Sequence, residues 1–200
     1  MVTLRVTPRP EAAFMKVAQI SKPGADFEIV ERAIPNPGAG QVHIKVQADA
    51  VCHSDVLTKE GSWPGIQYPS VPRREVAGII DGLGAGVSAW KAGQRVGVGW
   101  RSGQDNTCRE CRRGDFRNCQ NLEISFISYD GGYQQHMVAS VEALVPIPDS
   151  LSDVEAAPLL CTGITTYNAL RHSGAFPGDL VAVQGIGGLG HQGVQWAKQV

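Results

Sequence analysis

The sequence predicts an α/β plus β fold, with a β-rich domain over residues 1–151 and the first part of an α/β domain over residues 152–200. Three observations support this. Short runs rich in valine and isoleucine, separated by turns rich in proline and glycine, continue to about residue 147 and are typical of strands. After about residue 150 the apolar residues recur at helical spacing. The end of the sequence is a buried-type apolar run, a glycine-rich turn and a further helical run.

Individual elements follow from the same signals. Strands are expected over residues 15–20, 27–34, 42–51, 76–81, 95–100, 134–139 and 143–147. A short helix over residues 54–60 should be closed by Gly61. In the second domain, Ser152 and Glu155 form a capping-box pattern, and residues 164–172 are expected to be helical. Residues 179–184 are predicted to form a buried strand, and residues 192–200 a helix.

Composition narrows the class of protein. The chain has 200 residues, 42% of them hydrophobic, which is enough for a normal core. Eighteen basic and nineteen acidic residues leave a formal charge of -1, so neither nucleic acid nor an anionic membrane is the expected partner. We expect a small-molecule ligand and a cytoplasmic protein, since no apolar run reaches membrane-spanning length and Arg5 and Arg9 alone do not define a transit peptide. The oligomeric state stays open, a homo-oligomer included.

Four chemically active residues, Cys52, His53, Ser54 and Asp55, follow one another where a predicted strand ends and a short helix begins. They bring a soft metal ligand, an imidazole, a hydroxyl and a carboxylate to one place. An inert buried thiol is the alternative for Cys52, because free cysteine is among the most buried residue types. The other two motifs of the chain favour the functional interpretation.

A cysteine-rich lobe is expected at about residues 101–120. Cys108 and Cys111 have the two-residue spacing that lets two thiolates hold one tetrahedral ion, and Cys119 supplies a third. Asp105 precedes Cys108 at the same spacing, so we predict a structural zinc site made of Asp105, Cys108, Cys111 and Cys119. The alternatives are a redox-active or merely exposed cysteine pair without metal, with Asp105 marking a decayed site.

The glycine-rich turn contains Gly185, Gly187, Gly188 and Gly190. Glycines 185, 187 and 190 match the dinucleotide-binding pattern, in which they allow a tight turn, the approach of a pyrophosphate and close contact between helix and strand. A glycine-rich turn without a ligand is the alternative. The acidic residue that would select NAD over NADP falls about 20 residues later, so the sequence predicts NAD or NADP without choosing.

Taken together, these motifs resemble the medium-chain dehydrogenase/reductase superfamily, specifically its zinc-type alcohol dehydrogenases. The resemblance covers nearly the whole chain and also includes Glu75-Val76-Ala77-Gly78 and Leu159-Leu160-Cys161-Thr162-Gly163. It implies a chaperonin-10-like (GroES-like) β catalytic domain followed by a Rossmann domain, here truncated. It further implies hydride transfer between NAD(P)(H) and an alcohol, aldehyde or ketone.

The resemblance also implies roles for single residues. Cys52 and Cys161 would bind a catalytic zinc, together with a histidine from a Gly-His-Glu motif. Ser54 would relay the alcohol proton, His53 would lie near the cofactor phosphate, and Asp55 and Glu75 would support the ligands from behind.

The chain departs from this pattern at one position. Where the family has Gly-His-Glu, it reads Arg73-Arg74-Glu75, and arginine has no lone pair for a metal. Two interpretations follow. In one, Glu75 becomes a metal ligand and Arg74 turns to solvent. In the other, which we favour, the catalytic metal is absent and Arg74 pairs with Glu75 or Asp55. The chain is therefore either a dehydrogenase-like oxidoreductase with an impaired catalytic zinc site or a truncated, non-catalytic relative that acts by binding.

Overall fold

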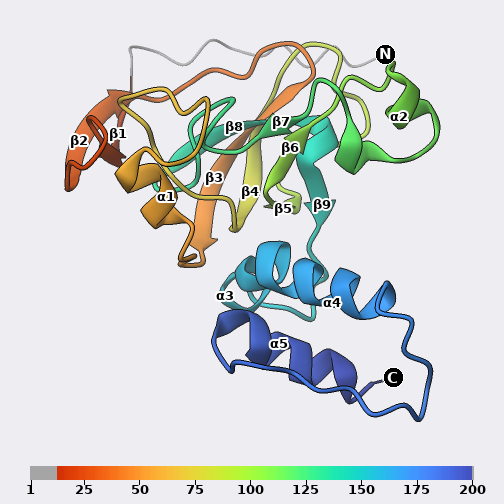
Figure 1. Ribbon diagram of the computed structural model, residues 1–200. Coiled ribbons are helices and arrows are strands. Elements are labelled where there is room, and N and C mark those ends of the chain that lie inside the picture. The colour runs from red at the N-terminus through yellow and green to blue at the C-terminus, as the bar shows by residue number, and fades with distance from the viewer. Residues whose placement is uncertain (1–12, 200) are drawn as a thin grey trace.

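The computed structural model describes residues 13–199, so residues 1–12 of the expected first domain and Val200 of the last predicted helix lie outside the described residues. Its centre is an antiparallel five-stranded sheet in the order β8-β3-β4-β5-β9 (Figure 1). The bounds are β3 Gln41–Asp49, β4 Val76–Leu83, β5 Arg95–Val98, β8 His136–Ser140 and β9 Leu144–Pro146. The β-rich first domain is therefore confirmed.

Two smaller antiparallel sheets flank the central one. The first pairs β1 (Phe14–Ile20) with β2 (Phe27–Ala33), and the second pairs β6 (Arg101–Gly103) with β7 (Glu123–Ile124). Isolated bridges from Val17 to Gln134 and from Ile20 to Ser70 tie β1 to the rest of the domain. The predicted strand over 95–100 is split in the structure, since β5 ends at Val98 and β6 begins at Arg101.

Alternating apolar residues place the core between these elements. Val42 and Ile44 of β3 and Val76 and Ile80 of β4 are fully buried, as the two-residue period of strands requires. They belong to one cluster whose buried members also include Val96, Val98, Met137, Ala139, Ala143 and Leu144. This core fixes the ends of β3 and β4, from which the chemically active residues project.

Short helices fill the connections of the first domain. Helix α1 (Asp55–Glu60) begins after Ser54 and ends at Gly61, whose φ of 71° is the left-handed conformation that glycine adopts without strain. The cysteine-rich lobe contains α2 (Arg109–Arg112) and the 3₁₀ turn η1 (Phe116–Asn118), and a second 3₁₀ turn, η2 (Val141–Ala143), precedes β9. Among residues 13–199, no helix has both the length and the apolar character needed to cross a bilayer.

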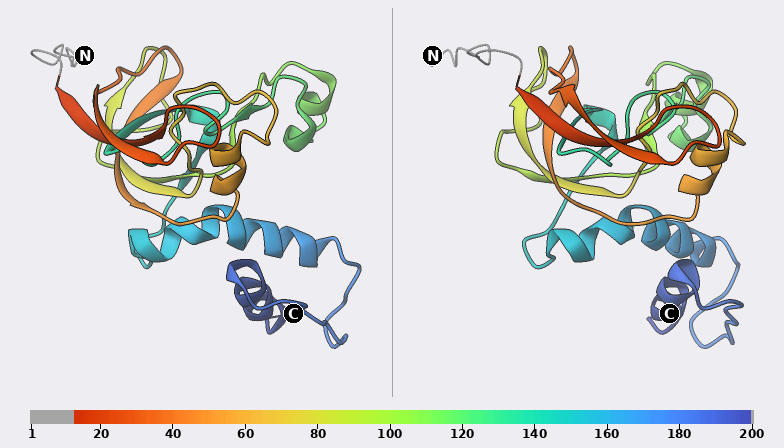
Figure 2. Two further views of the ribbon diagram at one scale, coloured as in Figure 1. Left: turned by 60° about the vertical axis from the view of Figure 1, so that its left-hand side comes forward. Right: turned by 90° about the vertical axis from the view of Figure 1, so that its left-hand side faces the viewer.

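The second domain lies beneath the central sheet in all views (Figures 1 and 2). It consists of α3 (Asp153–Pro158), the π-helical turn η3 (Leu159–Gly163), α4 (Ile164–Arg171) and α5 (Gly188–Ala197). The predicted capping box is present, since the Ser152 hydroxyl accepts from the Glu155 backbone N–H and the Glu155 carboxylate accepts from Ser152. Ala156 and Ala157 of α3 pack on Ala77 of β4, which joins α3 to the sheet.

One predicted element is wrong. Residues 179–184 form no strand, and Leu180 is 99% exposed. A buried parallel-type strand needs neighbours for its backbone hydrogen bonds, and none of the described strands lies beside this segment. The following helix is longer at its start than predicted, because α5 begins at Gly188 within the glycine-rich turn instead of at residue 192.

Candidate active site

Cys52, Glu75 and Cys161 meet at the junction of the two domains. Cys52 follows β3, Glu75 immediately precedes β4, and Cys161 lies in the π-helical turn η3. One ligand atom from each residue lies within 4.8 Å of the others. Single π-helical turns inside helices are frequent at functional sites. Here the π-helical turn η3 contains Cys161. The structure thus brings together three residues from distant parts of the sequence.

Ser54 and Arg74 complete this cluster. The Ser54 hydroxyl donates to the Cys52 sulfur at 2.9 Å. The Arg74 guanidinium donates from Nη2 to the Ser54 hydroxyl and, at 3.5 Å, to Cys52 Sγ, while it stacks over the Phe126 ring at 5.5 Å. Arg74 therefore points into the cluster and does not turn to solvent.

Arg73, the neighbour of Arg74, is fully buried and forms the ion pairs of this region. Its Nη1 lies 2.8 Å from Asp55 Oδ2, its Nε lies 3.4 Å from Asp49 Oδ1, and its guanidinium stacks 4.7 Å from the Tyr133 ring centre. The predicted pairing of Arg74 with Glu75 or Asp55 is thus wrong. Asp55 forms its ion pair with Arg73, and Arg74 forms no ion pair within the described part of the chain.

Sequence reasoning missed the role of Arg73 and did not single out Asp49, Tyr133 or Phe126. Tyr133 also donates from its hydroxyl to Asp55 at 3.1 Å. The φ of Arg73 is 106°, a backbone conformation that favours glycine. The only available signal was the arginine standing where the related motif has glycine, since a buried arginine there needs carboxylates around it.

The two cysteines share one proton unevenly. The hydrogen bond from the Cys161 thiol is the main cause that lowers the pKa of Cys52, to about 3. Burial opposes this shift, and hydrogen bonds from Ser54 and Arg74 add to it. The hydrogen bond to Cys52, together with burial, raises the pKa of Cys161. Cys52 therefore carries the negative charge of the pair and Cys161 holds the proton.

Two buried carboxyl groups have raised pKa values. Burial and the nearby negative charge of Cys52 raise the pKa of Glu75 to about 7, and burial, opposed by Arg73, raises that of Asp49 to about 7. Burial also raises the pKa of Asp55, against the effect of Arg73. Glu75 and Asp49 therefore change charge near neutral pH.

The donor atoms of Cys52, Glu75 and Cys161 converge, but the Arg74 guanidinium among them opposes a catalytic zinc. A zinc ion bound to Cys52 would lie about 2.3 Å from its sulfur, where the Arg74 guanidinium already donates at 3.5 Å. A permanent cation and a divalent ion would compete for the same sulfur lone pairs and repel each other at low dielectric. Arg74 also donates to the Ser54 hydroxyl, so its guanidinium lies beside the residue expected to relay the substrate proton.

The cysteine-rich lobe, by contrast, fits a tetrahedral ion. Asp105, Cys108, Cys111 and Cys119 each offer an atom within 4.8 Å of the others, and the sulfurs of Cys108 and Cys119 lie 4.0 Å apart. Zinc–sulfur bonds of about 2.3 Å in a tetrahedron place two sulfurs about 3.8 Å apart. The Cys111 backbone N–H donates to Cys108 Sγ at 3.4 Å, as in a folded metal knuckle.

Asp105 has a second function in this lobe. Its Oδ1 accepts from the backbone N–H groups of Thr107 at 2.8 Å and Cys108 at 2.9 Å, and its Oδ2 accepts from Asn121 at 2.7 Å. These hydrogen bonds, led by the one from Cys108, lower the pKa of Asp105. Asp105 therefore shapes the turn before the cysteines and keeps an ionised oxygen beside them.

The glycine-rich turn has the geometry of a phosphate-binding turn. Gly185 has a φ of 83°, and a Cβ added at Gly190 would lie 1.8 Å from the Gly185 carbonyl oxygen, so α5 can approach the turn only with glycine there. A Cβ at Gly187 or Gly188 would meet no atom within 4 Å, which leaves the start of α5 open to a ligand. These features fit a dinucleotide pyrophosphate. His53, the predicted phosphate neighbour, is exposed in the loop before α1.

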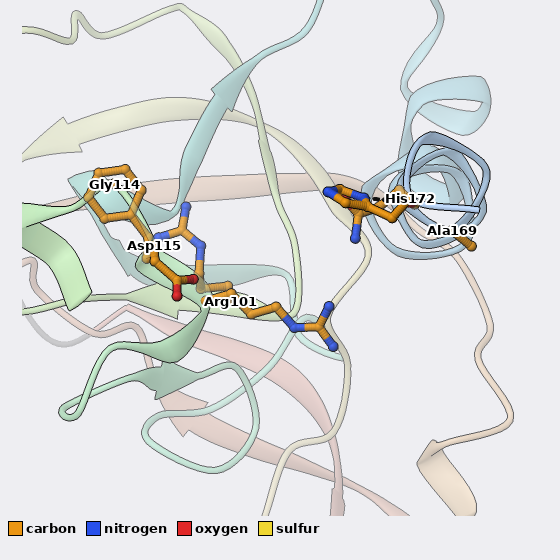
Figure 3. Close-up of a pocket in the computed structure, with 8 residues that line it drawn as sticks. Arg101, Gly114, Asp115, Ala169 and His172 are labelled. Carbon is orange, nitrogen blue, oxygen red and sulfur yellow. Dashed lines mark hydrogen bonds between the residues drawn. The ribbon is translucent and has the colours of Figure 1, made fainter. Parts of the chain in front are cut away.

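A cavity of about 580 Å³ lies away from this cluster, between the cysteine-rich lobe and α4. Figure 3 shows Arg101 extending toward the helix that carries Ala169 and His172, with Gly114 and Asp115 on the lobe side. The Arg101 guanidinium donates to the Gln104 side chain and stacks over the Phe116 ring. The cavity therefore contributes none of the residues that meet around Cys52.

The chain belongs to the zinc-type alcohol dehydrogenases of the medium-chain dehydrogenase/reductase superfamily. Residues 38–149 match the family described as "Alcohol dehydrogenase GroES-like domain". This match confirms the predicted GroES-like domain and the resemblance drawn from the motifs.

Named relatives agree with this membership. The alcohol dehydrogenase patD of Penicillium expansum is 40% identical over 184 residues, which are 92% of this chain and 54% of that protein. A cobalt- and zinc-bound alcohol dehydrogenase from Pyrobaculum aerophilum superposes with a TM-score of 0.86 at 30% identity, over 94% of this chain and 56% of that one. A protein titled CAD from Helicobacter pylori, complexed with NADP(H), gives 0.86 at 29% identity, over 94% and 57%. The chain thus spans about half the length of the relatives it matches.

Proposed function

We propose that this chain is the catalytic domain and the start of the cofactor domain of an NAD(P)-dependent oxidoreductase that interconverts alcohols with aldehydes or ketones. The observation that carries the proposal is the Ser54 hydroxyl, hydrogen-bonded between Cys52 and Arg74 at the domain junction. Support comes from the family membership, from the open glycine turn before α5, and from the NADP(H) complex of the Helicobacter pylori relative.

The proposed chemistry uses the residues of this chain without a catalytic metal. The nicotinamide cofactor supplies or accepts the hydride when bound. Arg74 donates hydrogen bonds toward the carbonyl oxygen and stabilises the negative charge that develops on it, and Ser54 passes the proton to that oxygen. A guanidinium is a weaker electrophile than zinc, so we expect activated carbonyl compounds to be reduced in preference to the oxidation of simple alcohols.

We further propose that the cysteine-rich lobe holds a structural zinc. Its geometry supports this, since four donors converge and two of them, Cys111 and Cys119, are buried. The ion would lock the lobe to β6 and β7, which otherwise pair over very few residues.

A panel of aldehydes and ketones, assayed with NADH and NADPH on the complete natural protein, tests the proposal. We expect turnover of activated carbonyl compounds by the wild type and a loss of about 10²–10³-fold in kcat for Arg74→Gln. Arg171→Gln, an exposed arginine on α4, is the matched control and should retain full activity. Equal activity of wild type and Arg74→Gln would overturn the proposed role of Arg74.

A second candidate is a non-catalytic relative that acts by binding, and the guanidinium in the metal position favours it. Cofactor titration separates the two functions, with tryptophan fluorescence as the signal. An oxidoreductase must bind NADH or NADPH and turn over a carbonyl compound. Cofactor binding without turnover of any compound in the panel would favour the second candidate, and so would the absence of binding.

A further inference from the structure

Cys52 and Cys161 form a pair of neighbouring thiols, and the Arg74 guanidinium donates to the sulfur of Cys52. We propose that they constitute an oxidisable dithiol, a modification site for hydroperoxides, which closes reversibly to a disulfide. The inference rests on the metal-free site proposed above, because zinc would bind both sulfurs and protect them.

The distance between the sulfurs permits the bond. Both Sγ atoms belong to a group of donors that lie within 4.8 Å of one another, and a disulfide needs a separation of about 2.05 Å. The sulfurs therefore have to approach by less than about 3 Å. Cys52 lies in the loop between β3 and α1, where a side-chain rotation and a small backbone adjustment can supply this movement.

The surroundings of Cys52 make it the attacking sulfur. It receives the Ser54 hydroxyl at 2.9 Å and the Arg74 guanidinium at 3.5 Å, and such donors stabilise a thiolate. Its side chain is partly exposed, so a small oxidant can reach it. Cys161 is also partly exposed and stands beside it as the resolving thiol.

The reaction balances with hydroperoxide as the oxidant. The Cys52 thiolate attacks one peroxide oxygen, an S–O bond forms, the O–O bond breaks, and hydroxide leaves and takes up a proton as water. The sulfur of Cys161 then attacks the sulfenic acid, its proton leaves with the departing hydroxyl group as a second water, and the S–S bond forms. Two thiols lose two electrons, and the peroxide is reduced to two waters.

The cysteine-rich lobe provides an internal comparison. The sulfurs of Cys108 and Cys119 lie 4.0 Å apart, a separation that would also permit a disulfide. A zinc ion in the lobe would hold these thiolates and protect them, whereas nothing comparable protects Cys52 and Cys161. Oxidation is therefore expected to select the pair at the domain junction.

The test treats the purified natural protein with a small excess of hydrogen peroxide and maps the disulfides by mass spectrometry of a non-reduced digest. We expect a Cys52–Cys161 link that dithiothreitol reverses, with the lobe cysteines unmodified. In Cys161→Ser, Cys52 should remain a sulfenic acid that dimedone labels. Arg74→Gln should react at least about tenfold more slowly than the control Arg171→Gln, because the guanidinium donor is lost.

The zinc content of the same sample shows whether a negative result overturns only the dithiol proposal or also the proposed metal-free site. One zinc per chain with unreacted Cys52 would overturn the dithiol and leave the proposed oxidoreductase intact. Two zinc ions per chain would overturn both the dithiol and the metal-free site. A link between lobe cysteines alone would also overturn the inference, since the selectivity would be the reverse of that expected.

Discussion

Arg74 donates from Nη2 to the sulfur of Cys52 across 3.5 Å, and to the hydroxyl of Ser54 beside it. This relationship gives the site a permanent cation of its own. In a zinc-type alcohol dehydrogenase the same sulfur is expected to face a metal. The consequences for metal content, stability and cofactor binding can each be measured.

Removal of the buried cation next to this site should destabilise the domain. Arg73→Met leaves Asp49 and Asp55 buried without their partner, and we expect a loss of about 3–5 kcal/mol in the free energy of unfolding. Arg95→Met is the control, because the Arg95–Asp153 pair is partly exposed and should contribute less. Chemical denaturation measures both, and equal losses would contradict the assigned role of Arg73.

Stability should depend on pH through Asp49. Its folded-state pKa is raised from 3.8 to about 7 by burial, so the folded state binds a proton that the unfolded state has released in this interval. The stabilising contribution is complete below about pH 4 and is lost as the pH rises through about 7.

Asp49→Asn removes this titration. We expect the wild type to lose stability relative to Asp49→Asn between pH 5 and 8, by an amount on the order of 2 kcal/mol. Thermal unfolding at a series of pH values measures the difference. Parallel curves for the two proteins would show that Asp49 is ionised in the folded state across the whole range.

Asp105 should have separable roles in the cysteine-rich lobe. Asp105→Asn keeps an oxygen that can accept from the Thr107 and Cys108 N–H groups but removes the carboxylate charge beside the proposed zinc. We expect the fold to be retained and zinc affinity to fall about 10–100-fold, as judged by competition with a chelator. Asp105→Ala should lower both zinc affinity and the melting temperature. Unchanged zinc affinity in Asp105→Asn would exclude the carboxylate from the site.

Two glycines of the turn should respond differently to alanine. At Gly187 an added Cβ meets no atom within 4 Å, so Gly187→Ala should keep its melting temperature and lose cofactor affinity by tenfold or more. At Gly190 the Cβ would lie 1.8 Å from the Gly185 carbonyl oxygen, so Gly190→Ala should lower both. Cofactor titration and thermal unfolding distinguish these outcomes. Normal cofactor binding by Gly187→Ala would contradict a dinucleotide site at this turn.

Much of the fold could be predicted because local signals agree with the tertiary structure. The valine- and isoleucine-rich runs of β3 and β4, Gly61 at the end of α1 and the Ser152–Glu155 capping box each lie where the sequence places them. Residues 179–184 were predicted wrongly because a strand depends on hydrogen bonds to other strands, and apolar composition alone cannot supply them.

The sequence identified the residues of the site but not the contacts between their side chains. Cys52, Glu75 and Cys161 do converge, and the lobe donors do as well. Arg73 and Arg74 are adjacent in the sequence, so the sequence did not show that their side chains make different contacts. With a φ of 106° at Arg73, its side chain reaches Asp49 and Asp55. The side chain of Arg74 faces Cys52 instead.

The most direct test is the zinc content of the purified natural protein and of two variants, measured by elemental analysis per chain. We predict one zinc in the wild type, none in Cys108→Ser, and two in a protein that carries Arg73→Gly together with Arg74→His. Two zinc ions in the wild type, or one retained by Cys108→Ser, would contradict the proposal that Arg74 has replaced the catalytic metal.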